Sequence, residues 1–439
     1  MNLSVLRNAL AILVVLGTAG CGLFEEETIR IPGERISVLS LDRDLEPDQR
    51  IADLQVRLPR PVATESWPMS GGNANHALHH VAVPVSISQA WRTNIGEGSD
   101  STMRLLATPV VADGRVFTMD VESQITALNA ANGEIFWQQD LKVPEDDEEA
   151  FGGGIAYGNG RLFISTGFAD VVSLNADTGK EIWRARLSGP MRAAPTVSGN
   201  RVFVITIDNQ AFALNADTGE RSWTHSGFAE VAGLLGGASP AVGDGAVLIP
   251  YSSGEIFALR EENGRLLWSD NLSSSRRLDA ISTLADIRGL PVIDQGLAFA
   301  ISHSGRMVSI DIRSGTRAWE QSIGGVNMPW VAGQFVYVLT NENQVVCLTR
   351  RGGRVRWVRN LPQFEKSDSR DDPIKWSGPV LAGDRLIITG SHGEAWSVSP
   401  YTGEVLGRQE LPGPVFLPPV AAGGTVYFLT EDGDLVAMR

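Results

Sequence analysis

Apolar and polar positions alternate along most of the chain in short runs that recur as one unit. Each unit starts at a proline with an apolar run, turns at a glycine, continues with two further apolar runs, and ends at a tryptophan preceded by another glycine. The copies Leu174-Asn-Ala-Asp-Thr-Gly179-Lys-Glu-Ile-Trp183 and Leu214-Asn-Ala-Asp-Thr-Gly219-Glu-Arg-Ser-Trp223 are nearly identical. Short apolar runs bounded by turn residues are typical of β-strands, so each unit predicts a four-stranded sheet.

The positions that close the units are separated by 38 to 51 residues. This spacing is typical of four-stranded propeller blades, whose repeats are about 40 to 50 residues long. The closing positions are Trp91, Trp137, Trp183, Trp223, Trp268, Trp319, Trp357 and Leu406. The last has leucine followed by glycine where tryptophan is expected, and eight closing positions predict eight blades.

The two ends of the repeat region complement each other. The last unit starts at Pro419 and stops after its third apolar run, at Arg439, whereas Ile87–Trp91 is an isolated closing strand. We therefore predict an all-β, eight-bladed β-propeller over residues 65–439, closed by pairing of 87–91 with 419–439. Radial closure leaves only short, protected strand edges. A solenoid of similar period is the alternative, but it requires capping repeats at both ends.

The amino terminus carries a targeting signal. Arg7 precedes an apolar run that ends in Thr18-Ala-Gly-Cys21, which predicts a signal peptide over residues 1–20 and is too short for a membrane span. This ending resembles the bacterial lipobox, which implies that a lipid is attached to Cys21. Because Gly22 follows, the resemblance also implies that the protein is anchored in the outer membrane. Simple cleavage near Gly20 is the alternative. Residues 21–64 are charged and predict a flexible tether with one short helix near residues 46–56.

Composition narrows the function further. The net charge of -14 argues against binding to nucleic acid, whose phosphates would be repelled. The two cysteines, Cys21 and Cys347, exclude a disulfide framework and an attached haem, and Cys347 in an apolar strand predicts a core residue.

The Ala-Asp-Thr-Gly-x-x-x-Trp copies resemble the tryptophan-docking repeats of pyrroloquinoline quinone enzymes. Those enzymes stack the quinone on paired cysteines or a similar platform and hold calcium beside a catalytic Asp, and the chain has no paired cysteines. The group His76, His79 and His80 could bind a metal, and the acidic run 145–149 could bind calcium, but neither has the ligand spacing of a known site. We therefore predict no catalytic residue, cofactor or metal.

A lipobox joined to a tryptophan-closed propeller without a quinone site resembles the BamB family of lipoproteins. The resemblance implies a non-catalytic scaffold of the outer-membrane β-barrel assembly machinery, anchored to the outer membrane on its periplasmic face. It further implies binding to the POTRA region of BamA and a role in folding outer-membrane proteins. Nascent barrel strands are a second possible partner, through addition to exposed strand edges.

Contacts in this family concentrate on two neighbouring loops, which here are residues 232–239 and 281–289. The resemblance implies that Leu234, Leu235, Asp286 and Arg288 bind the partner. Leu235 stands where the family has Arg, and Arg288 where it has a second Asp, so the charge pattern is partly exchanged. Ordinary loop residues are the alternative. At the level of function, a quinone-dependent dehydrogenase and an envelope sensor or polysaccharide-binding propeller remain alternatives.

Overall fold

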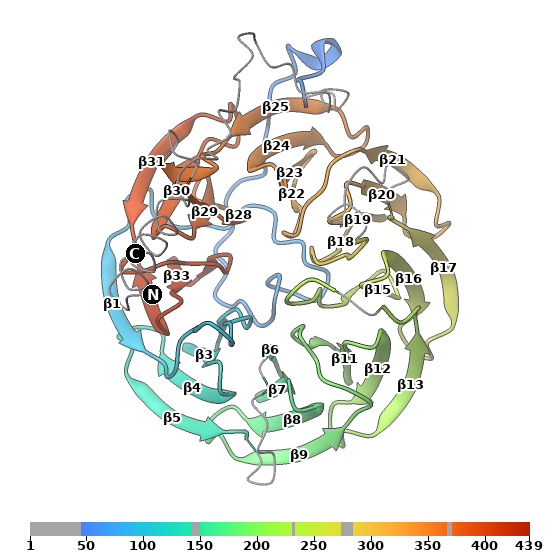
Figure 1. The fold of residues 1–439 in the computed structure, drawn as a ribbon, viewed down its shortest axis with the longest axis vertical. Helices are drawn as coiled ribbons and strands as arrows, with labels where there is room; N and C mark the ends of the chain where they lie inside the picture. Colours follow the sequence, from blue (N-terminus) through green and yellow to red (C-terminus); the bar gives the residue numbers. More distant parts are fainter. Residues whose placement is uncertain (1–44, 143–149, 151, 231–232, 274–283, 367–370) are drawn as a thin grey trace, which may run out of the picture. The chain divides into compact units, whose positions relative to one another are not determined.

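The tryptophan-closed repeats form eight four-stranded antiparallel sheets in the computed structural model, which describes residues 45–142, 150, 152–230, 233–273, 284–366 and 371–439. The sheets, here called blades, follow one another around a ring (Figure 1). Each blade faces its neighbours on both sides, so its second and third strands are almost entirely buried, as in β7 and β8. The outermost strands alternate between exposed and buried positions, as in β13. The predicted eight-bladed propeller is confirmed.

Blade 1 consists of β1 (Gln89–Asn94), β32 (Val420–Ala422), β33 (Thr425–Leu429) and β34 (Asp434–Met438). Blade 2 consists of β2 (Val110–Ala112), β3 (Arg115–Met119), β4 (Gln124–Asn129) and β5 (Ile135–Asp140). Blade 3 consists of β6 (Gly153–Gly158), β7 (Arg161–Thr166), β8 (Asp170–Asn175) and β9 (Glu181–Arg186). Blade 4 consists of β10 (Thr196–Ser198), β11 (Arg201–Ile205), β12 (Gln210–Asn215) and β13 (Arg221–Ser226).

Blade 5 consists of β14 (Ala241–Gly243), β15 (Ala246–Pro250), β16 (Glu255–Arg260) and β17 (Leu266–Asn271). Blade 6 consists of β18 (Val292–Asp294), β19 (Leu297–Ile301), β20 (Met307–Asp311) and β21 (Arg317–Gln321). Blade 7 consists of β22 (Trp330–Ala332), β23 (Phe335–Leu339), β24 (Gln344–Thr349) and β25 (Val355–Asn360). Blade 8 consists of β28 (Trp376–Ala382), β29 (Arg385–Gly390), β30 (Glu394–Val398) and β31 (Val405–Glu410), preceded by the hairpin β26 (Phe364–Lys366) and β27 (Asp371–Pro373).

The ring closes between the two ends of the repeat region. Strand β1 pairs antiparallel with β34, with Trp91 opposite Ala437. Next to this pair, the backbones of Ser88 and Arg439 exchange two hydrogen bonds of 3.0 Å. Blade 1 therefore joins segments about 350 residues apart, and no turn connects its third and fourth strands.

Seven tryptophans join neighbouring blades in one repeated way. The indole Nε1–H of each donates to a backbone carbonyl of the next blade, at 2.7 to 3.2 Å. The ring lies on the glycine of that blade's last turn: a Cβ added at Gly179 would lie 2.7 Å from Trp137. This glycine has φ +70, so both the conformation and the contact require glycine.

The junction between blades 8 and 1 lacks a tryptophan, and the register corrects its predicted closing position. Gly407 pairs with Ser397 just as Trp319 pairs with Ser309, so Gly407, and not Leu406, is at the tryptophan position. A Cβ at Gly407 would meet no atom within 4 Å. Because no turn connects β34 to β1, blade 1 offers no glycine on which a tryptophan could lie.

Residues 64–81 run once around the ring and contact the inner part of every blade. Met69 packs in one hydrophobic cluster with residues of blade 4. Hydrogen bonds join the segment to the other seven blades, between the pairs Thr64 and Gly423, Trp67 and Val111, Pro68 and Tyr157, Ala74 and Val242, Asn75 and Ile293, His79 and Trp330, and Val81 and Leu381. We call residues 64–81 the inner segment.

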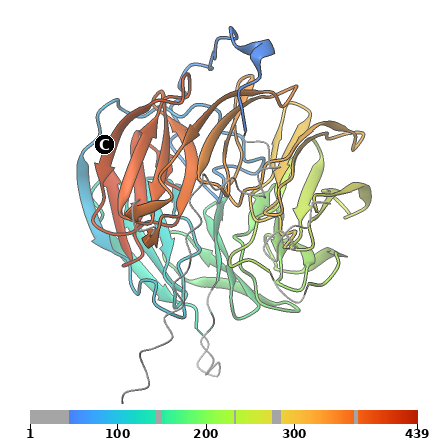
Figure 2. The same ribbon diagram turned by 45° about the horizontal axis from the view of Figure 1, so that its top comes forward.

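The predicted tether includes residues that are bound to the propeller. The helix predicted near residues 46–56 is a three-residue 3-10 helix, η1 (Gln49–Ile51), which lies outside β25 in two views (Figures 1 and 2). Asp48 N–H donates to the carbonyl of Val355, and Arg356 Nε donates to the carbonyl of Leu54. The tether prediction therefore applies only to residues 21–44, which lie outside the described residues, as does the predicted signal peptide.

Antiparallel pairing gives the ring two different faces. The turns between first and second strands lie on one face, where the inner segment binds, and we call it the closed face. The turns between second and third strands and the connections between blades lie on the other, which we call the loop face. In the described part of the chain, no helix has the length and apolarity needed to cross a membrane.

Candidate functional site

The structure brings the four predicted partner-binding residues together on the loop face. Leu234 and Leu235 lie in the connection from β13 to β14, and Asp286 and Arg288 lie in the connection from β17 to β18. The carboxylate of Asp286 accepts a hydrogen bond from the backbone N–H of Leu234 at 2.8 Å. Arg288 Nε donates to the backbone carbonyl of Leu235 at 2.6 Å. Two side chains of one loop thus hold the backbone of the other.

The burial of Asp286 indicates that this charged pair positions the loop. Asp286 is only 5% exposed, and desolvation raises the pKa of its carboxyl, an effect opposed by the Leu234 N–H and by the positive charge of Arg288. Desolvation likewise lowers the pKa of the Arg288 guanidinium, against the charge of Asp286. Buried charges are tolerated when hydrogen-bonded groups compensate them. The side chain of Asp286 faces the first loop and has little surface for an external partner.

The first loop presents its leucines outward. Leu235 is 40% exposed, and Leu234 is partly buried. Gly236 has φ +92, and a Cβ there would lie 2.9 Å from Arg288 Nε. Glycine at this position lets the guanidinium approach the loop closely. We call the two hydrogen bonds from Asp286 and Arg288 to the backbone of Leu234 and Leu235 the clamp.

Two further exposed apolar residues lie on the same face and were missed from the sequence. Phe228, in the connection that carries the leucines, is 73% exposed, and Ile207, in the turn between β11 and β12, is 46% exposed. The corresponding turns of blades 5 and 7 carry Ser252 and Asn341. The sequence did contain a signal for Ile207, because an apolar residue stands in a turn where these other blades have a polar residue.

Asn209 joins three segments beneath these residues. Its side-chain N–H donates to the carbonyl of Phe228 at 2.6 Å, and its Oδ1 accepts from the backbone N–H and hydroxyl of Ser252 at 3.2 and 3.0 Å. The N–H of Ile207 donates to the carbonyl of Pro190. Each of these bonds links a turn of one blade to a connection or to a turn of another blade, so the loops are held in a defined arrangement.

The three histidines considered as a metal site have separate partners in the structure. His76 Nδ1 donates to the carbonyl of Pro291, His79 lies 3.4 Å from the carboxylate of Asp294, and His80 Nδ1 donates to the carbonyl of Pro59. The described residues include no cluster of three or more His, Cys, Asp or Glu that could hold a metal ion. These histidines fix the inner segment.

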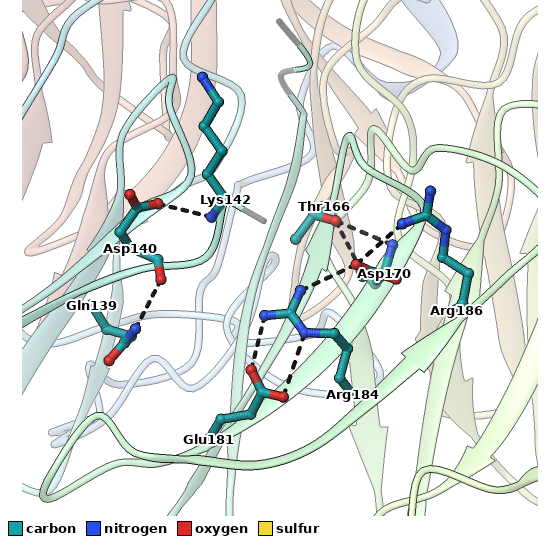
Figure 3. Close-up of polar contacts among 8 residues, drawn as sticks. All are labelled: Gln139, Asp140, Lys142, Thr166, Asp170, Glu181, Arg184 and Arg186. Carbon is teal, nitrogen blue, oxygen red and sulfur yellow. Dashed lines mark hydrogen bonds and ion pairs between the residues drawn. The ribbon is translucent and has the colours of Figure 1, made fainter. Parts of the chain in front are cut away.

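A second polar cluster lies at the loop-face end of blade 3 (Figure 3). Asp170 is 2% exposed, and its carboxylate lies 3.1 Å from Arg184 and 3.5 Å from Arg186. Arg184 also pairs with Glu181 at 2.8 Å. The described residues that pair with Asp170 all belong to its own blade, which indicates a structural role. The acidic run 145–149 lies outside the described residues.

The cysteines give no reactive site in the described chain. Cys347 is fully buried, which confirms the core assignment, and desolvation raises the pKa of its thiol, so the reactive thiolate is disfavoured. Cys21, the predicted lipidation site, lies outside the described residues.

Comparison with known proteins extends over most of the chain. The family model described as outer membrane protein assembly factor BamB matches residues 86–147, 121–359 and 365–439. The outer membrane protein assembly factor BamB of Shigella dysenteriae serotype 1 (strain Sd197) is 28% identical over 354 residues, which cover 80% of this chain and 88% of that protein.

Two solved structures show the same fold. The crystal structure of BamB from Moraxella catarrhalis aligns with a TM-score of 0.67 and 19% identity, covering 81% of this chain and all of that one. The quinohemoprotein alcohol dehydrogenase ADHIIG from Pseudomonas putida HK5 aligns with a TM-score of 0.65 and 12% identity, covering 88% and 83%. At these identities, both likenesses concern the fold alone, so function must be argued from the loops.

Proposed function

The chain belongs to the family of outer membrane protein assembly factor BamB, and from this premise we propose that it is a non-catalytic scaffold subunit of the outer-membrane β-barrel assembly machinery. It binds the POTRA region of BamA through the loop face and thereby assists the folding and insertion of outer-membrane proteins. A lipid on Cys21 holds it at the periplasmic face of the outer membrane, because several acyl chains give stable anchoring where one does not.

The observation that carries this proposal is the clamp between the two loops. Asp286 and Arg288 bind the backbone on either side of the leucine pair, and Leu235 remains 40% exposed. Exposed apolar anchors surrounded by polar groups provide most of the binding energy in protein interfaces. Because the loop is already held in place, little conformational entropy is lost when a partner binds it.

The chemistry of the site favours binding over catalysis. The carboxylate of Asp286 and the guanidinium of Arg288 are engaged by backbone groups of the neighbouring loop. The paired-cysteine platform of quinone enzymes does not fit this chain, because Cys347 is a single buried thiol and the only other cysteine is Cys21. We therefore derive no quinone chemistry for it.

Substitution of the exposed leucine tests the proposal. Leu235→Asp in the full lipoprotein should remove most BamA from the material that co-purifies with it from detergent-solubilised outer membranes, because a charge replaces an apolar anchor. Leu267→Asp is the matched control, since Leu267 is 43% exposed but lies on the outer strand β17. Undiminished BamA with Leu235→Asp, at wild-type thermal stability, would contradict the proposed interface.

A further inference from the structure

An open cavity of about 700 Å³ lies on the closed face, where blades 5, 6 and 7 meet. The turns that line it all belong to this face, because antiparallel pairing places the turn between third and fourth strands on the same face as the turn between first and second strands. Four charged residues of its lining are at least partly exposed and form no ion pair with any described residue: Asp244, Asp311, Arg313 and Arg351. The cavity therefore presents both positive and negative charge to a ligand.

Both kinds of charge in the cavity are held in place. Arg350, which is 2% exposed, lies 2.7 Å from the carboxylate of Asp294. Desolvation lowers the pKa of the Arg350 guanidinium, and the nearby positive charge of Arg351 lowers it further, so an anion bound at Arg351 would offset a repulsion. The carboxylate of Asp311 accepts hydrogen bonds from the backbone and hydroxyl of Ser314, which lower its pKa and keep it ionised.

Exposed apolar side chains gather on the same face, at the end of blade 8. We call them the apolar rim, and they are Val62, Val85, Tyr401, Val405 and Leu406, with exposed fractions of 63%, 85%, 39%, 38% and 58%. Tyr401 lies in the closed-face turn from β30 to β31, and Val405 and Leu406 begin β31. Grouped apolar residues on a surface mark contact with a protein or a membrane.

The two valines of the apolar rim are fixed against blade 8. Val62 lies beside Val81, which in turn pairs with Ala382 at the closed-face end of β28. The carbonyl of Val85 accepts a hydrogen bond from Arg385, the first residue of β29. The apolar rim is thus a defined part of the closed face.

The described chain begins at this face, which decides between a protein and a membrane as the occupant. The N–H of Asp48 donates to the carbonyl of Val355, which directly follows the closed-face turn at residues 350–354. A lipid on Cys21, as proposed above, keeps a bilayer close to the propeller. A bilayer also supplies in one surface both apolar chains and charged headgroups, which are the two chemistries that the closed face presents.

We propose that the closed face rests on a phospholipid surface, with one zwitterionic headgroup in the cavity and the apolar rim inserted among the lipids. The headgroup phosphate binds Arg313 and Arg351, and its ammonium group binds Asp244 and Asp311. The inference rests on the lipid anchor of the proposed function. It leaves the loop face turned away from the membrane and free for BamA.

A fluorescent probe on each face tests this orientation. Leu406→Cys and Leu235→Cys each add one reactive thiol to the full lipoprotein, because Cys347 is buried and Cys21 carries the lipid. In vesicles of phosphatidylcholine and phosphatidylethanolamine that contain a doxyl-labelled lipid, the probe on Leu406→Cys should be quenched and its emission shifted to the blue. The probe on Leu235→Cys, on the loop face, is the matched control and should remain unquenched.

Charge reversal in the cavity tests the headgroup. Arg313→Glu combined with Arg351→Glu should remove the quenching at Leu406→Cys, because the phosphate is then repelled. Arg221→Glu combined with Arg265→Glu is the matched control, since both residues are exposed near closed-face turns but lie outside the cavity lining. Vesicles of phosphatidylcholine alone should quench less, because a quaternary ammonium group has no N–H to donate to Asp244 and Asp311.

The outcomes separate this inference from the proposed function. If the lipoprotein floats with the vesicles but neither probe is quenched, or both are quenched equally, the membrane proposal is overturned and the lipid anchor stands. If the lipoprotein does not float, both are overturned. Quenching that survives the double substitution in the cavity, or that is equally strong without phosphatidylethanolamine, overturns the headgroup assignment. An unchanged melting temperature of the double variant excludes unfolding as the cause of lost quenching.

Discussion

The closed face and the loop face are held together by different kinds of contact. On the closed face, one continuous segment binds every blade, mostly through backbone hydrogen bonds, and buries Trp67 and Val81. On the loop face, side chains such as Asp286, Arg288 and Asn209 bind the backbones of neighbouring connections and leave apolar residues exposed. The first arrangement stabilises the ring, and the second leaves an apolar surface exposed, which we propose is the binding surface for the partner protein.

This difference separates stability from recognition. Substitutions on the closed face should lower the free energy of unfolding without altering the loops, and substitutions on the loop face should lower affinity without unfolding the ring. Two substitutions and one change of pH test this contrast.

The largest effect is expected for Trp67→Ala on the closed face. Trp67 is 3% exposed, exchanges two hydrogen bonds with Val111 and stacks on Trp330 of blade 7, with ring centroids 6.1 Å apart. Truncation of a buried tryptophan costs about 3 to 5 kcal/mol, and guanidinium unfolding should show this loss. A loss below about 1 kcal/mol would mean that the inner segment does not stabilise the ring.

The second largest effect is expected from acid, which should lower the free energy of unfolding through a group on the closed face. Burial lowers the pKa of His76 to about 4, and its Nδ1 hydrogen bond to Pro291 only partly opposes this. Because the folded state disfavours the proton, stability is complete above the unfolded value of 6.5 and falls as the pH drops toward 4. The shift corresponds to roughly 3 kcal/mol. The melting temperature measured between pH 7 and pH 4 should reveal this loss.

His76→Asn is the control for the acid effect. His76 has φ 59, in the left-handed region, which Asn tolerates better than most residues. The asparagine amide can donate to the Pro291 carbonyl in place of the imidazole, but it does not titrate. The variant should lose less stability than the wild type over the same pH range, and an equal loss would assign the acid effect to other groups.

The smallest effect is expected for Asp286→Ala on the loop face. The Leu234 N–H loses its acceptor, so the loop should become less ordered and affinity for the POTRA region should fall by about tenfold. Asp286→Asn keeps an acceptor and removes a buried charge whose pKa is already raised by desolvation, so it should retain affinity. Equal losses in both variants would show that the charge itself contacts the partner.

The repeats made the propeller predictable because their signal resides in side chains. Each docking tryptophan lies on a glycine of the next blade, and no other residue fits at that position. Both the tryptophan and the glycine therefore recur in the sequence. The inner segment has no such signal, since its contacts are mainly between backbone groups, which any residue supplies. The closing position in blade 8 was assigned one residue too early, although the spacing of four residues from the turn glycine Gly403 also indicates Gly407, as the strand register does.

The candidate site was predictable only in part. Resemblance to a family identified the two loops and all four residues, and the structure brings these residues together. The clamp was not predictable, because hydrogen bonds from side chain to backbone across 52 or 53 residues leave no pattern in the sequence. Phe228 and Ile207 were missed because exposure depends on packing that exists only in the folded ring.

The path of the inner segment also sets the order in which the molecule can be assembled. Residues 64–81 precede the blades in the sequence and are synthesised before them, yet their last partners include Leu381 of blade 8 and Gly423 of blade 1. Contacts between residues so distant in sequence form slowly, because the intervening chain must first be ordered. The ring therefore closes only after its final blade has been synthesised, and until then residues 64–81 lack these partners.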